Sequence, residues 1–86
     1  MKFYIQTIEQ IYDKDKNITE YGATERVGTE QEALTKFYKK LSDVAADIDK
    51  NHTYMDIKIV NSLGGCIKKD AVGKYQEEVE INTEEN

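Results

Sequence analysis

The 86-residue sequence contains no proline, no tryptophan and a single cysteine, Cys66. One cysteine cannot form an internal disulfide, which excludes a disulfide framework and favours a reducing, cytoplasmic setting. No apolar run approaches the roughly 20 residues that a membrane-spanning helix needs, and the N-terminus lacks the hydrophobic region of a secretion signal. We therefore expect a small cytoplasmic domain with one core and no membrane association.

Basic residues are missing from the C-terminal part of the chain. Residues 76–86 contain five of the 17 acidic residues and no Lys or Arg, so 12 acidic residues remain in the rest of the chain, where they balance the 12 basic ones. A run of like charges at a terminus normally stays solvated, because ordering it costs entropy and adds repulsion. The sequence therefore predicts a single domain over residues 1–75 and an acidic, flexible tail over residues 76–86.

Two extended segments near the N-terminus predict a β-hairpin. Residues 2–12 are rich in aromatic and β-branched side chains, and their alternation places Phe3 and Ile5 on one face of a strand. Residues 13–17 are all polar and favour a turn, and a second extended run covers residues 18–27.

Residues 30–49 predict an amphipathic helix. Thr29, followed three residues later by Glu32, is typical of a capped helix start. Apolar residues then recur in steps of three and four and form one stripe, which we expect to be buried against a sheet: Ala33, Leu34, Phe37, Tyr38, Leu41, Val44, Ala45 and Ile48.

A second hairpin follows the helix. Residues 53–61 alternate between apolar and polar side chains, Gly64 and Gly65 suit a tight turn, and a return strand starts at Cys66. The pattern weakens after Asp70, so whether residues 71–82 form an additional strand stays open.

The element order predicts an α+β fold, a two-layer ββαββ arrangement with one helix packed on one face of an antiparallel sheet. We expect the strand order 2-1-3-4, because antiparallel pairs are commoner and slightly more stable than parallel ones. Strands 2 and 4 are then the edges. Lys68, Lys69 and Asp70 protect strand 4 from pairing, whereas the uncharged residues 21–24 leave strand 2 less protected.

No group of residues predicts a catalytic, cofactor-binding or metal site. Cys66, His52 and Asp56 are the only set that resembles a nucleophile, a base and an orienting acid, but about 27 Å of strand separates the histidine from the cysteine. One His and one Cys also cannot supply the four ligands of a zinc site. We therefore expect that the protein is not an enzyme.

The candidate interaction surface is the sheet face opposite the helix, with Tyr21 added from the less protected edge. Its residues are Tyr4, Gln6, Gln10, Tyr54, Lys58 and Tyr21. Tyrosine offers a large contact area at low entropic cost, which suits a protein–protein patch. The same tyrosines are open to two other interpretations, a platform on which single-stranded bases stack and a purely structural set of cross-strand pairs. The balanced charge of the body disfavours nucleic acid, because phosphate binding needs a positive field.

These observations predict a non-enzymatic binding or interaction domain that acts through a protein partner or a weak homodimer. The alternative is an inhibitor of the kind carried by phages and mobile elements, whose acidic tail occupies a nucleic-acid-binding protein. A single-stranded nucleic-acid binder that uses the sheet tyrosines is less favoured than either, and an enzyme is the least favoured hypothesis.

Overall fold

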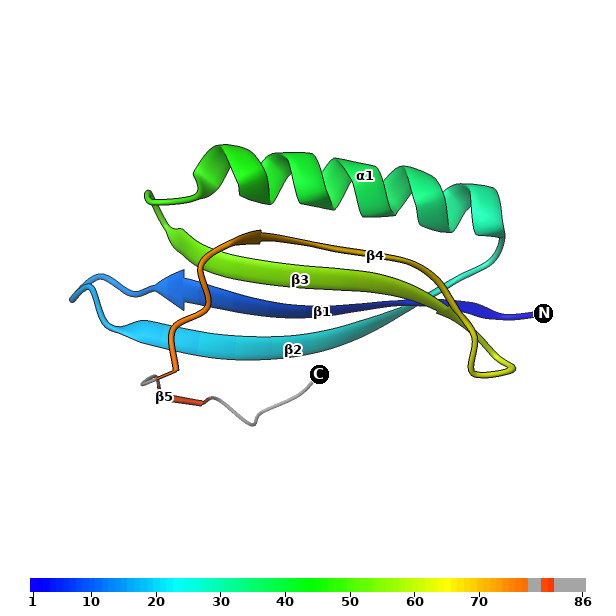
Figure 1. The fold of residues 1–86 in the computed structure, drawn as a ribbon, viewed down its shortest axis with the longest axis horizontal. Coiled ribbons are helices and arrows are strands. Elements are labelled where there is room, and N and C mark those ends of the chain that lie inside the picture. The colour runs from blue at the N-terminus through cyan, green and yellow to red at the C-terminus, as the bar shows by residue number, and fades with distance from the viewer. Residues whose placement is uncertain (78–79, 82–86) are drawn as a thin grey trace.

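A computed structural model describes residues 1–77 and 80–81. It confirms the α+β fold, with four antiparallel strands in the order 2-1-3-4 and one helix on one face (Figure 1). A short fifth strand extends the sheet to the order β4-β3-β1-β2-β5. The elements are β1 (Phe3–Tyr12), β2 (Ile18–Val27), α1 (Glu30–Asp47), β3 (His52–Asn61), β4 (Cys66–Gly73) and β5 (Glu80–Ile81).

The first hairpin forms as expected from its polar turn. The Asp13 carboxylate accepts hydrogen bonds from the backbone amides of Asp15 and Asn17, at 2.8 and 2.9 Å. The Asp13 backbone amide donates to the Asn17 carbonyl at 2.8 Å. From there β1 and β2 pair without a register shift along their whole length.

Thr29 caps α1, because its hydroxyl oxygen accepts a hydrogen bond from the Glu32 amide at 3.1 Å. The helix ends at Asp47, two residues before the expected end at 49. Ile48 is already extended, and Asp49 adopts a left-handed backbone with φ 69°. This early end turns the chain back at once into β3.

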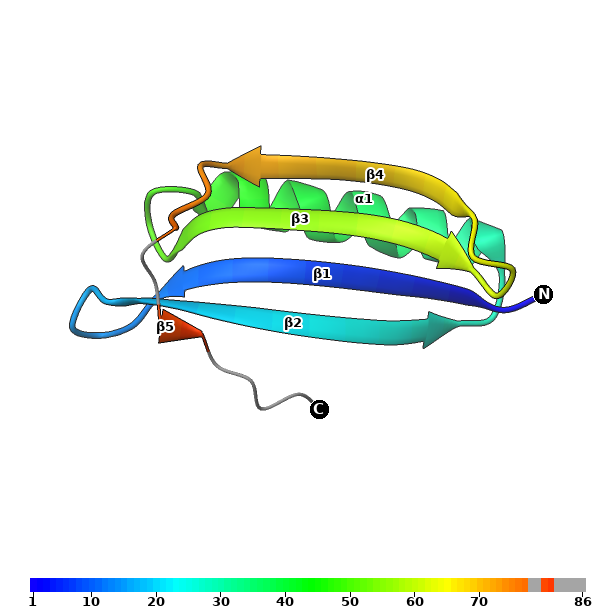
Figure 2. The same cartoon turned by 60° about the horizontal axis from the view of Figure 1, so that its bottom comes forward.

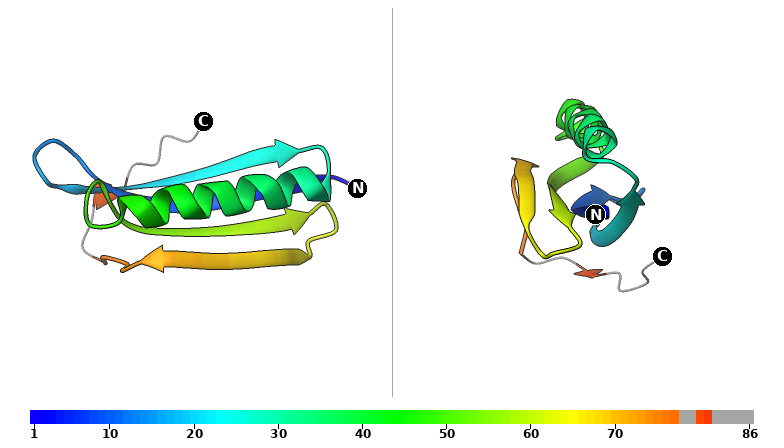
Figure 3. Two further views of the ribbon diagram at one scale, coloured as in Figure 1. Left: turned by 90° about the horizontal axis from the view of Figure 1, so that it is seen from above. Right: turned by 90° about the vertical axis from the view of Figure 1, so that its right-hand side faces the viewer.

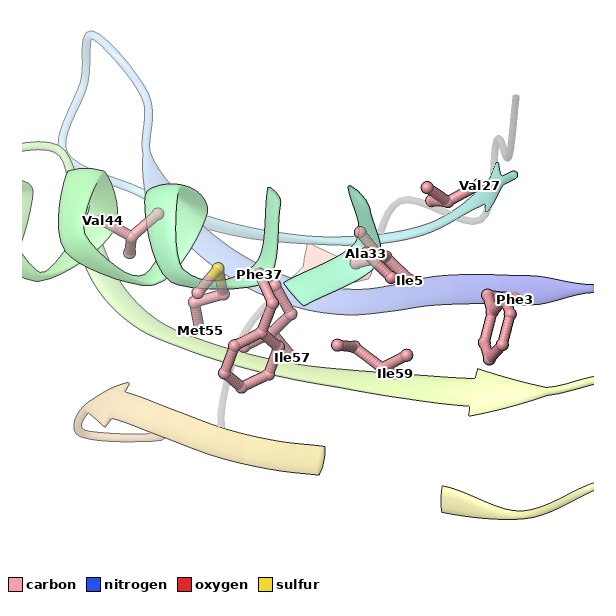
Figure 4. Close-up of a cluster of buried hydrophobic side chains, with 9 residues drawn as sticks. All are labelled: Phe3, Ile5, Val27, Ala33, Phe37, Val44, Met55, Ile57 and Ile59. Carbon is pink, nitrogen blue, oxygen red and sulfur yellow. The ribbon is translucent and has the colours of Figure 1, made fainter. Parts of the chain in front are cut away.

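The core lies between α1 and the covered face of the sheet (Figure 4). Phe37 is fully buried, while Leu34, Leu41 and Ile48 are only partly buried at its margin. The expected apolar stripe therefore packs on the sheet, although Tyr38 and Ala45 of that stripe are exposed. Nine hydrophobic residues form the buried cluster: Phe3, Ile5, Val27, Ala33, Phe37, Val44, Met55, Ile57 and Ile59.

The helix lies over the middle of the sheet, with β2 to one side of it and β4 to the other (Figure 3, left). Face-on, β3 and β1 are the two central strands of the four long ones (Figure 2). The helix-side surface of β2 is largely exposed as a result.

After β4 the chain crosses the sheet face that α1 does not cover (Figure 3, right). Gly73 turns it there with φ 81°, and the Lys74 amide donates to the Thr53 carbonyl at 2.8 Å. We call residues 74–77 the crossing segment. Beyond it, β5 pairs in parallel with β2 at Thr19 and Glu20.

The open question about residues 71–82 thus has a partial answer. Residues 71–73 belong to β4, and residues 80–81 form β5, while residues 78, 79 and 82 lie outside the described part of the chain. Of the acidic tail expected over 76–86, only residues 76, 77, 80 and 81 are described. The flexibility of the tail and its use as an acidic inhibitor stay predictions.

Candidate functional site

Tyr4, Gln6 and Lys58 form one contiguous patch on the open face of the sheet, by which we mean the face opposite α1. Gln6 lies between Lys58 of β3 and Thr24 of β2, and Tyr4 is the next residue of β1 on the same face. The Lys58 side chain is exposed, and the other two are half-buried. These three predicted contact residues are therefore accessible together.

Gln10 lies on the same face but is fully buried, so it offers no contact area to a partner. The crossing segment covers it. Gln10 Nε2 donates to the Gln76 carbonyl at 2.8 Å, and Gln10 Oε1 accepts from the Gln76 amide at 2.8 Å. Gln10 is therefore not exposed on the expected interaction surface. Together with the bonds to Glu20 and Thr53, these two bonds give its polar side chain partners away from water.

The Tyr54 side chain also contacts other residues of the protein. Its ring meets the Tyr75 ring edge to face, with 5.2 Å between the centroids, and its hydroxyl donates to the Asp56 carboxylate at 2.9 Å. Burial first, and then the hydrogen bond to Asp56, raise the pKa of Tyr54 to about 12. The crossing segment therefore covers part of Tyr54 through Tyr75.

Tyr21 lies on the other face of the sheet. It pairs with Glu9, whose side chain points to the helix side and contacts His52 and Lys40 there. Tyr21 is 41% exposed and belongs to the helix-side surface of β2 that stays largely uncovered. The six predicted residues therefore lie in three places. Three form the patch on the open face, two contact the crossing segment, and Tyr21 lies on the helix side of β2.

Two features of the open face bear on the prediction that single-stranded bases stack on its tyrosines. Tyr54 pairs with Gln10, which lies six positions from Tyr4 along β1, a separation of about 20 Å. The shallow hollow beside Lys58 includes Lys69 but also Asp56, so its charge is mixed. Neither the spacing of the rings nor the charge favours a nucleic-acid strand on this face.

The structure does not bring His52 and Cys66 together, since they lie near opposite ends of β3. His52 is instead held between two carboxylates. Its Nδ1 lies 2.6 Å from Asp47 Oδ2, and its Nε2 lies 3.0 Å from Glu9 Oε1. The hydrogen bond from His52 is the largest cause that lowers the pKa of Asp47.

This arrangement ties the end of α1 to β1 and leaves neither ring nitrogen facing solvent. No local signal predicts this role of His52, because its two carboxylates come from elements that only the fold brings together. Among residues 1–77 and 80–81, no group of three or more His, Cys, Asp or Glu side chains could hold a metal ion.

Among the described residues, the outer edge of β2 has an unpaired side beyond the two residues that pair with β5. The Asp13–Asn17 bond marks a hydrogen-bonded pair, so in continuous register the odd-numbered residues of β2 bond to β1. The even-numbered residues Gly22, Thr24 and Arg26 consequently point their amides and carbonyls away from the sheet. In the described part of the chain, nothing pairs with that side of residues 21–27.

A groove runs beside this edge, between β2 and α1, with a volume of about 210 Å³. Ile5 and Ala23 form part of its floor, and Lys36 and Lys40 come from the helix. Lys36 forms an ion pair with Glu25 across it. The groove can accept side chains of moderate size from a segment that pairs with β2.

The opposite edge of the sheet is different in character. Strand β4 carries Lys68, Lys69 and Asp70 near its middle, and charged side chains of this kind discourage strand pairing. Edge β2 is therefore the better candidate site.

No helix in the described residues is long and apolar enough to cross a membrane. The sequence matches no family model, and neither the curated proteins nor the solved structures give a match.

Proposed function

We propose that this protein is a small, non-enzymatic binding domain that takes up an extended segment of a protein partner as an additional strand on β2. The observation that carries the proposal is the pairing of β5. The chain's own C-terminal part already adds a strand to this edge at Thr19 and Glu20, and the adjoining residues 21–27 present the same kind of unpaired groups. Strand addition to an exposed edge is a common mode of peptide recognition.

Affinity in this mode comes from the main chain. The amides and carbonyls of Gly22, Thr24 and Arg26 would each meet a complementary group of the added strand, with a net gain of about 1 kcal/mol for each hydrogen bond. The small residues Gly22 and Ala23 leave the edge accessible to an approaching backbone.

Specificity comes from alternate side chains of the added strand. Those on the helix side would enter the groove lined by Ala23, Lys36 and Lys40. Those on the open face would lie beside Thr24 and Arg26, next to the patch of Tyr4 and Gln6. A segment with β-branched residues facing the groove and an acidic residue facing Arg26 fits this surface best.

A selection from a display library of linear peptides on the immobilised full-length chain tests the proposal. Thr24→Pro removes one outward amide and leaves the hydrogen bonds to β1 in place, since proline is tolerated on an edge strand. Thr24→Ala is the matched control, because it shortens the side chain but keeps the amide. We expect selected peptides to bind Thr24→Ala like the wild type and Thr24→Pro about tenfold more weakly.

Two results would contradict the proposal. One is a selection that yields no binder. The other is a set of binders that Thr24→Pro leaves unaffected but that changes at Tyr4 or Lys58 weaken, which would move the site to the open face.

A further inference from the structure

The free part of β2 is complementary to a second copy of itself. The outward-pointing amides and carbonyls of one β2 strand must bond to those of the other. An antiparallel pair of two β2 strands therefore sets even-numbered residues opposite even-numbered residues. With two-fold symmetry, the pairing can then centre on Gly22, on Ala23 or on Thr24.

Only one of these three registers places opposite charges face to face. When the pair centres on Ala23, Glu20 lies directly opposite Arg26 of the second copy, and the symmetry repeats this contact. Centring on Gly22 or on Thr24 moves Arg26 away from Glu20 and leaves both charges without a facing partner. Cross-strand pairs of opposite charge stabilise a sheet, whereas like charges destabilise it.

The same register suits the helix side of the sheet. Tyr21, a residue that is 41% exposed, faces Glu25 of the second copy, so its apolar surface becomes covered. Gly22, Ala23 and Thr24 at the centre are small enough to allow close approach. Since α1 lies over the middle of the sheet and not over the outer edge of β2 (Figure 3, left), two copies joined at that edge have room for both helices.

We propose that the occupant of this edge is a second copy of the chain, paired antiparallel through β2 and centred on Ala23, so that two sheets join into one. This inference rests on the proposed function, because it requires that β2 accepts an additional strand. A second copy is the partner that the charges of β2 fit best.

Pairing of the second copy competes with β5. Strand β5 pairs at Thr19 and Glu20, and the outer part of the dimer register needs the backbone of Glu20. Full pairing therefore requires β5 to leave, while the inner pairs of Gly22 with Thr24 can form beside it. The interface is small, so the concentration series must extend to about 1 mM to detect it.

Cysteine crosslinking tests the register directly in a Cys66→Ala background. In the proposed dimer Ala23 faces its own copy in a non-hydrogen-bonded pair, where the two Cα atoms lie about 4.5 Å apart, within reach of a disulfide. Glu25 and its copy lie four positions apart along the strand, about 13 Å. We expect Ala23→Cys to form a covalent dimer on mild oxidation, while Glu25→Cys stays monomeric.

Charge exchange gives an independent readout by sedimentation of the full chain. Arg26→Glu sets two glutamates against each other twice, and we expect it to weaken self-association about tenfold. Glu20→Lys places two basic side chains opposite each other, and we expect it to weaken self-association in the same way. An equimolar mixture of the two variants restores both attractive pairs, so it should associate more strongly than either variant alone.

Glu20 also accepts hydrogen bonds from Gln10 and Tyr75, so Glu20→Lys can disturb the crossing segment. Arg26 is exposed, and the result for Arg26→Glu therefore stands by itself. If Glu25→Cys crosslinks as fast as Ala23→Cys, or if the wild type is monomeric up to about 1 mM, the second copy is not the occupant.

Those outcomes leave the proposed function standing if selected peptides still lose affinity for Thr24→Pro. If the peptides ignore Thr24→Pro as well, β2 is not a pairing edge and both proposals fail.

Discussion

Gly73 controls the path of the crossing segment, and its replacement by alanine gives a sharp test of this part of the fold. Its backbone has φ 81°, a conformation that costs an L-residue about 1–2 kcal/mol. A Cβ at this position would lie 2.2 Å from the Thr53 carbonyl oxygen and 2.8 Å from Ile48 Cδ1. The carbonyl belongs to β3 and cannot rotate away, so the segment itself must move.

The hydrogen bonds of the crossing segment set the scale of the cost of Gly73→Ala. Release of the segment loses the bond from Lys74 to Thr53 and the two bonds between Gln76 and Gln10, each with a net value of about 1 kcal/mol. The exposed contacts of Tyr75 with Glu20 and Tyr54 are lost as well. The core beneath α1 does not include these residues. We therefore expect the free energy of unfolding to fall by about 2–3 kcal/mol, with the rest of the fold intact.

Urea unfolding followed by circular dichroism measures this loss, and tyrosine absorbance against pH provides a second readout. Release of the segment uncovers Tyr54, so its pKa should fall from about 12 towards the ordinary 10.0. Gly22→Ala is the matched control, since the added Cβ would meet nothing closer than the Thr7 carbonyl oxygen at 4.0 Å. An unchanged unfolding energy and an unchanged Tyr54 titration in Gly73→Ala would refute this reasoning.

Three further predictions concern the core and the titrating groups. Phe37→Ala should cost about 3–5 kcal/mol in the free energy of unfolding, whereas Tyr38→Ala, at a side chain that is 51% exposed, should cost about 1 kcal/mol or less; similar losses would contradict the packing described. The neutral Tyr54 phenol is favoured in the folded state, so its stabilisation is fully present below pH 10 and is lost as the pH rises towards 12. Wild type should therefore lose more stability over that interval than Tyr54→Phe, and parallel pH profiles would exclude this role. In His52→Ala the pKa of Asp47 should rise towards its ordinary 3.8, because the hydrogen bond from His52 is the main cause that lowers it; carboxyl chemical shifts measured against pH check this, and an unchanged Asp47 titration would contradict it.

The sequence was sufficient to predict the body of the fold, because its signals are local. Thr29 and the steps of three and four that follow it define α1, and the alternation around Ile57 defines which side of β3 is buried. The strand order then follows from the preference for antiparallel pairs, and the structure has this order.

The crossing segment could not be predicted in the same way, because polar contacts between distant residues hold it. Gln10 looks like a surface residue in the sequence, and only Gln76, 66 positions away, explains its burial. Gly73 was the one local signal, since a glycine at the end of a strand is typical of a change in direction.

The face of Tyr21 could have been found from the sequence. A turn over residues 13–17 sets Glu9 opposite Tyr21 and therefore places Tyr21 on the helix side. No sequence signal predicts that His52 lies between Asp47 and Glu9, because this contact depends on how α1 packs across the sheet.

Residue-resolved amide hydrogen exchange tests most directly the claim that β2 accepts an additional strand. In the dilute free chain we expect slow exchange at Tyr21 and Ala23, whose amides bond to β1, and fast exchange at Gly22 and Thr24, whose amides point outward. On saturation with a selected peptide, or at concentrations where the chain self-associates, Gly22 and Thr24 should become protected while their neighbours change little. If the amides of Gly22 and Thr24 exchange equally fast in the free and bound states, β2 is not the binding edge.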